Sequence, residues 1–266
     1  MATHERIRKV EAIVTSHSDY GETDRILNLY TREMGKARAL AKGIRKEHSR
    51  KAGHLEPFAC TTLMLARGSS FWIICQAETV DAFIPIREDL TKTAEAAYVS
   101  ELLERFTSED EVHLALYRLA KDTLERIARE TDAFQTLRYF EMRFLEMVGY
   151  RPELFHCVQC RVEIQAEDQF FSILQGGVLC PKCGRIADTA RPVSMLVLKY
   201  LRHFQRSDFE DVQKLNVAPL VRQEMEKIMQ SYLAYLAEHR LNTPAFLREI
   251  EQHTHPRSLP DDKIVK

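Results

Sequence analysis

Glycine and proline are distributed unevenly along the 266 residues of this chain. Five of the nine glycines lie between positions 21 and 68, whereas none occurs from 69 to 148 and no proline occurs from 86 to 151. Because these residues mark turns and interrupt helices, the long stretch without them favours helices, and the turn-rich stretch before it favours short strands. We therefore expect an α+β protein with its strands first and its helices second.

The turn-rich front contains short runs of β-branched and aromatic residues separated by turn signals, which is the pattern of strands. The runs are VEAIVTSHS, TDRILNLYT, KARALAKG, FACTTLMLA and FWIICQAETV. Five short strands fit a small sandwich or barrel, and an OB-type barrel has that number, although spacing does not separate it from other small barrels. We predict a five-stranded OB-type barrel over residues 1–85.

Beyond residue 85 the apolar residues recur at every third or fourth position, which predicts amphipathic helices. Three helices are expected between Leu90 and Val148, two more over 193–205 and 217–238, and a short one near 244–251. We therefore predict an all-helical domain over 86–250, followed by a flexible polar tail over 251–266.

Residue types at the expected helix ends and on the third helix allow finer predictions. Caps are expected at Ser108 to Asp110 and at Thr131 to Asp132, and Gly149 is expected to end the third helix. The aromatic stripe of that helix, which begins at Phe134, is expected to be core packing, since large aromatic side chains on one helix face are usually buried.

Four of the six cysteines form a C-x2-C-x19-C-x2-C motif, and they are Cys157, Cys160, Cys180 and Cys183. This spacing is typical of a four-thiolate zinc site, because each C-x2-C turn can point two sulfurs at one tetrahedral centre. A thioredoxin-like redox motif would need a single C-x2-C in a βαβ setting, and a site that has lost its metal is the other alternative. We expect one structural Zn²⁺ per chain, in an insert over residues 151–191 within the helical domain.

One histidine beside the motif and the two remaining cysteines are not expected to bind the metal. His156 precedes the first ligand and is expected to be a neighbour of the metal site, since four thiolates complete the coordination shell. Cys60 and Cys75 lie in apolar strand runs and are expected to be buried and reduced.

The formal net charge of -1 conceals a strong local excess of positive charge. Residues 32–51 contain eight basic and two acidic side chains, so the rest of the chain is net acidic. Such a run is usually a solvated face, but a cationic segment in a small barrel also favours binding of nucleic-acid phosphates. The stretch 42–54 is expected to be an exposed, mobile loop. Four aromatic residues could stack on bases, and they are Tyr20, Tyr30, Phe71 and Trp72. Aromatic residues in strands are, however, more often buried in the core.

The sequence gives no positive signal for catalysis or for a membrane. It contains no G-x4-G-K-[ST] loop, no H-E-x-x-H and no G-x-S-x-G motif. Carboxylates are spaced three or four residues from Lys or Arg, as on solvated helix faces. No apolar run approaches the length of a membrane span, and the N-terminus does not resemble a signal peptide. We expect a cytoplasmic protein that is not an enzyme.

The string DYGETDRILNLYTREMGKARALAKGIRK, followed by SRKAGHLEPF, closely resembles the start of the bacterial RecO family of recombination mediators. The order of barrel, helical region, four-cysteine insert and closing TPAFL segment is similar as well. The resemblance implies an OB barrel joined to a helical domain with a zinc-finger-like element. It also implies DNA contacts on the basic barrel surface, which here corresponds to Lys36, Arg38, Lys42, Arg45, Lys46, Arg50 and Lys51.

The same resemblance implies a function in DNA repair and homologous recombination that requires no catalysis. RecO-like proteins bind single- and double-stranded DNA and anneal complementary strands. With RecR they load RecA onto DNA coated by single-stranded-DNA-binding protein (SSB), and they bind the acidic C-terminal tail of SSB. A cytoplasmic, nucleoid-associated location follows from these roles. The alternatives are a zinc-containing nucleic-acid-binding regulator of transcription or RNA, and a metal-dependent nuclease.

Overall fold

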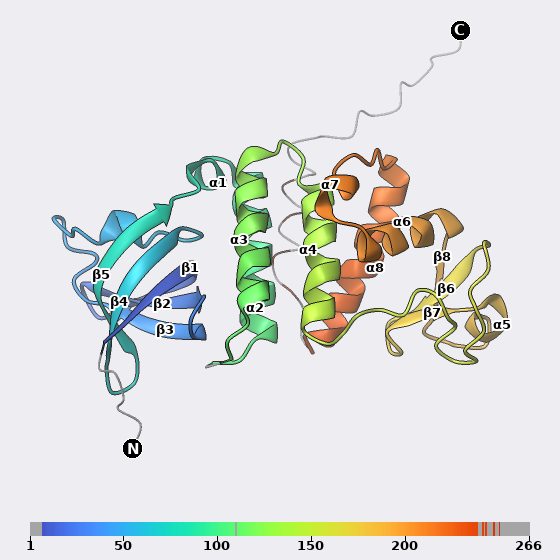
Figure 1. Cartoon of the computed structure of the whole chain (residues 1–266), viewed down its shortest axis with the longest axis horizontal. Helices are drawn as coiled ribbons and strands as arrows, with labels where there is room; N and C mark the ends of the chain where they lie inside the picture. The colour runs from blue at the N-terminus through green and yellow to red at the C-terminus, as the bar shows by residue number, and fades with distance from the viewer. Residues whose placement is uncertain are drawn as a thin grey trace, which may run out of the picture.

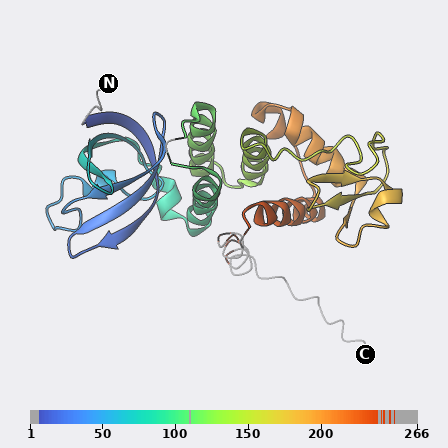
Figure 2. The ribbon, with the colours of Figure 1, turned by 90° about the horizontal axis from the view of Figure 1, so that it is seen from below.

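The computed structural model describes residues 7–109 and 111–238, together with residues 241, 243, 247 and 250. The molecule is elongated, with a β-barrel at one end, upright helices in the middle and a small sheet-containing insert at the other end (Figure 1). A view turned by 90° shows the same order along the long axis (Figure 2). The α+β fold class and the order of strands before helices are therefore confirmed.

Five strands form a closed barrel at the N-terminal end, in the order β1-β2-β3-β5-β4. The strands are β1 (Ile7–Tyr20), β2 (Asp24–Thr31), β3 (Gly35–Ala41), β4 (Cys60–Arg67) and β5 (Trp72–Asp81). All neighbouring strands are antiparallel except β3 and β5, which are parallel and pair only at Ala39–Trp72 and Leu40–Ile73. The predicted five-stranded OB-type barrel is confirmed, and it encloses its own apolar core.

Both cysteines outside the motif were expected to be buried, and the structure agrees for only one of them. Cys60 is fully buried, as expected, but Cys75 is exposed. The pairing of β4 with β5 shifts between Met64 and Leu65, so Leu65 pairs with Ile74, Met64 pairs with Gln76, and Cys75 is left without a partner. A bulge of this kind interrupts the alternation of inward and outward side chains, so an apolar run alone does not place each of its residues in the core.

The helical region contains the five predicted long helices and two short ones that the sequence pattern did not indicate. Its first part comprises α1 (Ile84–Glu88), α2 (Leu90–Phe106), α3 (Leu114–Arg129) and α4 (Phe134–Met147). After the insert follow α6 (Met195–Arg206), α7 (Phe209–Val212) and α8 (Pro219–Leu236). The predicted long helices are α2, α3, α4, α6 and α8. The aromatic stripe on α4 is buried, as predicted. The predicted helix near 244–251 and the tail over 251–266 lie outside the described residues, apart from residues 247 and 250.

The helix end predicted at Gly149 agrees with the structure, whereas the N-cap of α4 is Ala133, one residue after the predicted cap, and that of α3 is also displaced. Gly149 has a φ of 84°, and the N–H of Tyr150 donates to the carbonyl of Leu145 at 2.7 Å, so the chain leaves α4 through a glycine turn. The Asp132 carboxylate accepts the N–H of Phe134 at the start of α4. The cap of α3 is not in 108–110 but is His113, whose Nδ1 accepts the N–H of Leu116 at 3.2 Å.

The insert is a small three-stranded antiparallel sheet with one helical turn. Its elements are β6 (Gln169–Ser172), β7 (Gly177–Leu179), α5 (Pro181–Gly184) and β8 (Arg191–Val193), and the strand order is β7-β6-β8. Gly184 packs directly beneath the ring of Phe170, where a Cβ atom would come within 2.3 Å of the ring carbons. Glycine is therefore required after the second cysteine pair, and the insert packs into the same apolar core as the helices.

The barrel is fixed to the helices by apolar packing framed by polar contacts. Tyr30 of β2 stacks on Tyr117 of α3, with ring centroids 6.4 Å apart. On α2, the Glu104 carboxylate accepts the hydroxyl of Thr15 at 2.7 Å, and the Glu104 carbonyl accepts the ammonium of Lys36 at 2.6 Å. Within the described part of the chain, no helix is both long and apolar enough to cross a bilayer.

Candidate metal centre and nucleic-acid interface

The four motif cysteines meet at one point of the insert. Their Sγ atoms all lie within 4.8 Å of one another, and the sulfurs of Cys160 and Cys180 are 3.8 Å apart. Four thiolates at about 2.3 Å around one tetrahedral ion would place the sulfurs about 3.8 Å apart. The cysteines are free thiols with no disulfide between them, so the arrangement fits a metal ion.

Each cysteine pair is presented by a tight turn. In the first, the N–H of Arg161 donates to the carbonyl of Cys157 at 2.8 Å, and Arg161 has a φ of 64°. In the second, Pro181 starts the single turn of α5, and the N–H of Gly184 donates to the carbonyl of Cys180 at 2.8 Å. The β6–β7 hairpin between the pairs brings the two turns together, as the spacing predicted.

The electrostatics of the cluster favour a bound cation. Burial tends to raise the pKa of Cys157, but the backbone N–H groups of Cys160, Cys180 and Gln159 outweigh it and lower the pKa of that thiol. Burial and hydrogen bonding with the other three thiols raise the pKa of Cys183. Four thiolates therefore repel one another unless a cation lies between them, and a soft thiolate set suits Zn²⁺.

The neighbouring histidine is not part of the cluster. Among the described residues the group of possible ligands contains only the four cysteines. The exposed His156 instead lies 3.9 Å from the Glu153 carboxylate, through its Nδ1 atom. Four sulfurs complete a tetrahedral shell, so a metal held here stabilises the insert and leaves no position for a reacting water.

The basic segment divides into side chains that project outward and side chains that bind the protein. Lys42, Lys46 and Arg50 are exposed, and they lie in the turn and loop that follow β3. Arg45 is also exposed and forms an ion pair with Asp19, at 3.2 Å. Lys51 donates to the carbonyl of Ile74 at 3.1 Å.

The loop 42–54 is attached to the barrel at several points. Gly43 donates its N–H to the Asp24 carboxylate at 2.7 Å, and this hydrogen bond lowers the pKa of Asp24. His54 binds the hydroxyl of Thr79 at 2.8 Å, and Ile44 is buried in the barrel core. The backbone of the loop is therefore held against the barrel, while its exposed basic side chains project into solvent.

The remaining two predicted residues, Lys36 and Arg38, line a cleft on the barrel surface. The cleft has a volume of about 450 Å³ and lies between β3 and the turn that joins β4 to β5. Its described lining includes four basic side chains, two aromatic ones and a single carboxylate, and these are Arg8, Lys36, Arg38, Arg67, Phe71, Trp72 and Glu109.

Sequence reasoning missed two of these basic residues, Arg8 and Arg67. Both lie outside the basic run, and antiparallel pairing of β1 with β4 brings the two strand ends together, with Ile7 opposite Ala66. The available signal was the position of each arginine just outside a predicted strand, Arg8 two residues before the first run and Arg67 directly after the fourth. Of the aromatic residues considered for stacking, Tyr30 is buried, whereas Tyr20, Phe71 and Trp72 are at least partly exposed.

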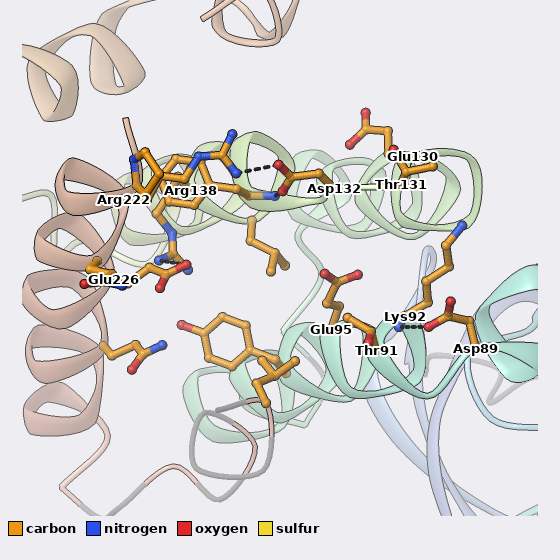
Figure 3. A pocket seen from close by; sticks show the side chains of 17 residues that line it. Asp89, Thr91, Lys92, Glu95, Glu130, Thr131, Asp132, Arg138, Arg222 and Glu226 are labelled. Atoms are coloured by element: carbon orange, nitrogen blue, oxygen red, sulfur yellow. Dashed lines mark hydrogen bonds and ion pairs between the residues drawn. The ribbon is translucent and has the colours of Figure 1, made fainter. Parts of the chain in front are cut away.

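A second cavity, of about 550 Å³, lies between α2, α4 and α8 (Figure 3). Its basic side chains are each engaged: Arg222 pairs with Asp132, Arg138 lies 3.7 Å from Glu226, and Lys92 donates to a backbone carbonyl. Carboxylates outnumber basic groups among its described lining residues. This cavity is therefore poorly suited to the phosphates of nucleic acid.

A closed barrel with a basic loop, joined to a helical domain whose four-cysteine cluster could hold a metal ion, defines a two-part protein. The family model described as Recombination protein O N terminal matches residues 4–83, and the one described as Recombination protein O C terminal matches residues 87–245. The chain belongs to the RecO family of recombination and DNA repair proteins.

Relatives named DNA repair protein RecO are similar over most of their length. The protein from Roseiflexus sp. (strain RS-1) is 35% identical over 248 residues, which cover 93% of this chain and 87% of the relative. The protein from Bacillus pumilus (strain SAFR-032) is 33% identical over 244 residues, covering 91% and 94%. The resemblance inferred from the N-terminal string is thus confirmed.

Proposed function

We propose that this protein is a non-catalytic recombination mediator that binds single- and double-stranded DNA and anneals complementary strands. With RecR, it would promote the loading of RecA onto DNA coated by SSB, and it would bind the acidic C-terminal tail of SSB. Family membership supports the general role in DNA repair and recombination. The observation that carries the DNA-binding step is the exposure of the basic side chains in the loop that follows β3, which are Lys42, Arg45, Lys46 and Arg50.

The seven basic residues named from the sequence are proposed to contact phosphates in different ways. Lys42, Lys46 and Arg50 have the exposure needed to neutralise a backbone directly. Lys36 is hydrogen-bonded to a helix carbonyl, so its contribution is mainly to the local positive potential. Such contacts do not depend on base sequence, which suits a protein that must pair any two complementary strands.

Annealing requires two phosphate backbones to approach each other while the base edges stay free. A cationic surface reduces the repulsion between the strands, and it does so without opening or cutting either one.

We further propose that residues 1–85 form the DNA-binding part and 86–250 the helical part, with 151–191 as its zinc-binding insert. The Zn²⁺ ion would hold this insert together, and the protein would act in the cytoplasm at the nucleoid.

The test replaces Lys42, Arg45, Lys46 and Arg50 together by Ala. We expect weaker binding of single and double strands, a flatter dependence of affinity on salt, and slower annealing. Glu125→Gln on α3 and Lys214→Ala in the turn after α7, both outside the barrel, serve as controls. Unchanged binding would remove the barrel surface from the proposal. A strong preference for structured RNA or for one duplex sequence, without annealing, would favour a regulator of transcription or RNA instead.

A further inference from the structure

The barrel cleft combines two chemistries that phosphate binding alone does not require. Arg8, Arg38 and Arg67 supply positive charge, whereas Phe71 and Trp72 supply aromatic surface. Neutralising a phosphate needs only the cations. Aromatic side chains beside cations are the arrangement that binds the face of an unpaired base next to its phosphates.

The strand topology explains why these aromatic residues line a cleft and are not fully buried. Trp72 is the first residue of β5, and it pairs with Arg67 of β4 and with Ala39 of β3. Because β3 and β5 pair at only two positions, the first half of β3 and the turn before β5 are not joined by a ladder. Phe71 lies in that turn, and the space beside it is the cleft.

Each aromatic ring is accompanied by a guanidinium group. The Arg38 guanidinium carbon lies 4.9 Å from the centroid of Phe71, and that of Arg8 lies 5.7 Å from the centroid of Trp72. On another side, the half-exposed Tyr20 meets Phe71 edge to face, with centroids 6.3 Å apart. A guanidinium held over a ring keeps its N–H donors available at its own edge, where phosphate oxygens can accept them.

We propose that this cleft binds an unpaired base of a DNA single strand by stacking on Trp72 or Phe71, with the flanking phosphates held by Arg8, Arg38 and Arg67. The inference rests on the proposed function. It assigns to the cleft a selectivity for single strands, in addition to the general DNA binding proposed for the basic loop 42–51. In a duplex the bases are stacked on their neighbours and paired, so their faces are not accessible to the cleft. The cleft therefore discriminates single strands from duplexes, whereas the exposed lysines of the loop bind both.

The chain contains one tryptophan, Trp72, so intrinsic tryptophan fluorescence reports on this cleft alone. The experiment titrates the full-length protein with an oligothymidylate and with an abasic oligonucleotide of the same length and charge. We expect the oligothymidylate to change the tryptophan emission and to bind at least about fivefold more tightly, since base–aromatic stacking contributes about 1–3 kcal/mol per base. The abasic strand is expected to bind through its phosphates with little change in emission.

A variant identifies the stacking surface while keeping the reporter. Phe71→Leu preserves apolar volume and leaves Trp72 in place, and it is expected to weaken oligothymidylate binding several-fold without changing the affinity for the abasic strand or for duplex DNA. Tyr235→Leu, at an exposed aromatic residue on α8, is the matched control and should leave all three affinities unchanged. Circular dichroism and thermal melting establish that both variants are folded.

Two outcomes separate this inference from the proposed function. Equal affinities for the abasic and thymidylate strands, with unchanged tryptophan emission, would overturn base stacking in the cleft. The proposed function would still stand if the loop variants lost DNA binding under the same conditions. Absence of binding to every DNA probe would overturn both.

Discussion

The ammonium of Lys121, on α3, donates a hydrogen bond of 2.7 Å to the carboxylate of Glu11, on the first strand of the barrel. The same carboxylate oxygen accepts the hydroxyl of Tyr117 at 3.1 Å, and the Cys60 thiol lies 3.7 Å away. Both charged side chains are partly buried, with 30% of Lys121 and 22% of Glu11 exposed. The barrel is therefore attached to the helical domain by a charge-assisted contact at the edge of an apolar interface, which holds the cationic surface in a fixed orientation.

Replacement of Glu11 by Gln should weaken this attachment. Removing the charge leaves the Lys121 ammonium partly buried beside a neutral amide, so we expect a loss of about 1–2 kcal/mol in the free energy of unfolding. Denaturant melts of the two proteins at neutral pH measure this. Glu125→Gln is the control, because its partner Arg129 is mostly exposed and such pairs contribute less than about 0.5 kcal/mol.

The pH dependence of that difference follows from the pKa shifts. Burial tends to raise the pKa of Glu11, but hydrogen bonds from Lys121 and Tyr117 outweigh it and lower the pKa below 4.5. The stabilisation is therefore full above the carboxyl's ordinary pKa and is lost as the pH falls through the lowered one. Burial tends to lower the pKa of Lys121, but Glu11 outweighs it and raises the pKa above 10.5. At the alkaline end the contribution is therefore full up to the ordinary pKa of lysine and is lost as the pH rises through the raised one. A wild-type advantage that stayed constant from pH 7 down to pH 2 would contradict this interpretation.

Metal removal should unfold the insert selectively. Cys157→Ser removes one ligand, and we expect loss of bound zinc together with a clear fall in thermal stability, because metal binding is coupled to folding of the loops that hold it. Elemental analysis and thermal melting in the presence and absence of a chelator test this. Cys75→Ser is the matched control, since that thiol is exposed and distant in sequence from the cluster. A metal-free protein of normal stability would argue against a structural zinc site.

Much of the fold follows from sequence because its signals are local. Glycine and proline placement located the boundary between strands and helices. Short β-branched and aromatic runs between turn signals located the barrel strands, and three-to-four periodicity located the long helices. Gly149 ended α4 as expected, since its left-handed φ is one that glycine adopts without strain. The short helices α1 and α7 escaped notice because each spans too few residues to show a period.

The metal centre was predictable and the cleft was not, for a physical reason. Four cysteines encode their site through spacing within one segment, whereas the cleft is assembled by strand pairing from residues as distant as Arg8 and Arg67. Neither arginine belongs to the basic run, and no local pattern joins them. The exposure of Cys75 escaped prediction for a similar reason, because a bulge depends on the register with the neighbouring strand.

A buried ion pair inside the helical domain gives a third prediction. Arg138 donates to the Glu141 carboxylate at 2.6 Å, and the Tyr98 hydroxyl donates to the same oxygen at 2.6 Å. Arg138→Met would leave Glu141 buried without a countercharge, at an expected cost of about 3–5 kcal/mol. Tyr98→Phe removes one hydrogen bond and should cost about 1–2 kcal/mol.

The pH range distinguishes this pair from the contact at Glu11, because the pKa of Glu141 is raised above 4.5 whereas that of Glu11 is lowered below it. Burial raises the pKa of Glu141, and Arg138 opposes that rise, so removing the arginine raises the pKa further. In Arg138→Met the folded state then takes up a proton more readily than the unfolded state, and the deficit in stability should shrink as the pH falls towards 4.5. Chemical denaturation at several pH values measures this, and a deficit that grew in acid would contradict the assignment.

Two glycines in left-handed turns provide a matched pair for testing how the barrel meets the loop between α2 and α3. Gly35 and Gly21 have φ values of 68° and 61°, so replacement by Ala costs similar backbone strain at each, about 1 kcal/mol. A Cβ atom at Gly21 meets nothing within 4 Å, whereas one at Gly35 would lie 2.0 Å from the carbonyl oxygen of Glu111. We therefore expect Gly35→Ala to destabilise the protein by at least about 2 kcal/mol more than Gly21→Ala, since backbone must move to relieve the overlap.

The same displacement should pull the chain at Glu109 away from its bridges with Gly35 and Lys36, at one wall of the cleft. Oligothymidylate binding by Gly35→Ala, measured below its melting temperature, should accordingly weaken while that of Gly21→Ala does not, and equal losses in both variants would show that backbone strain alone accounts for the effect.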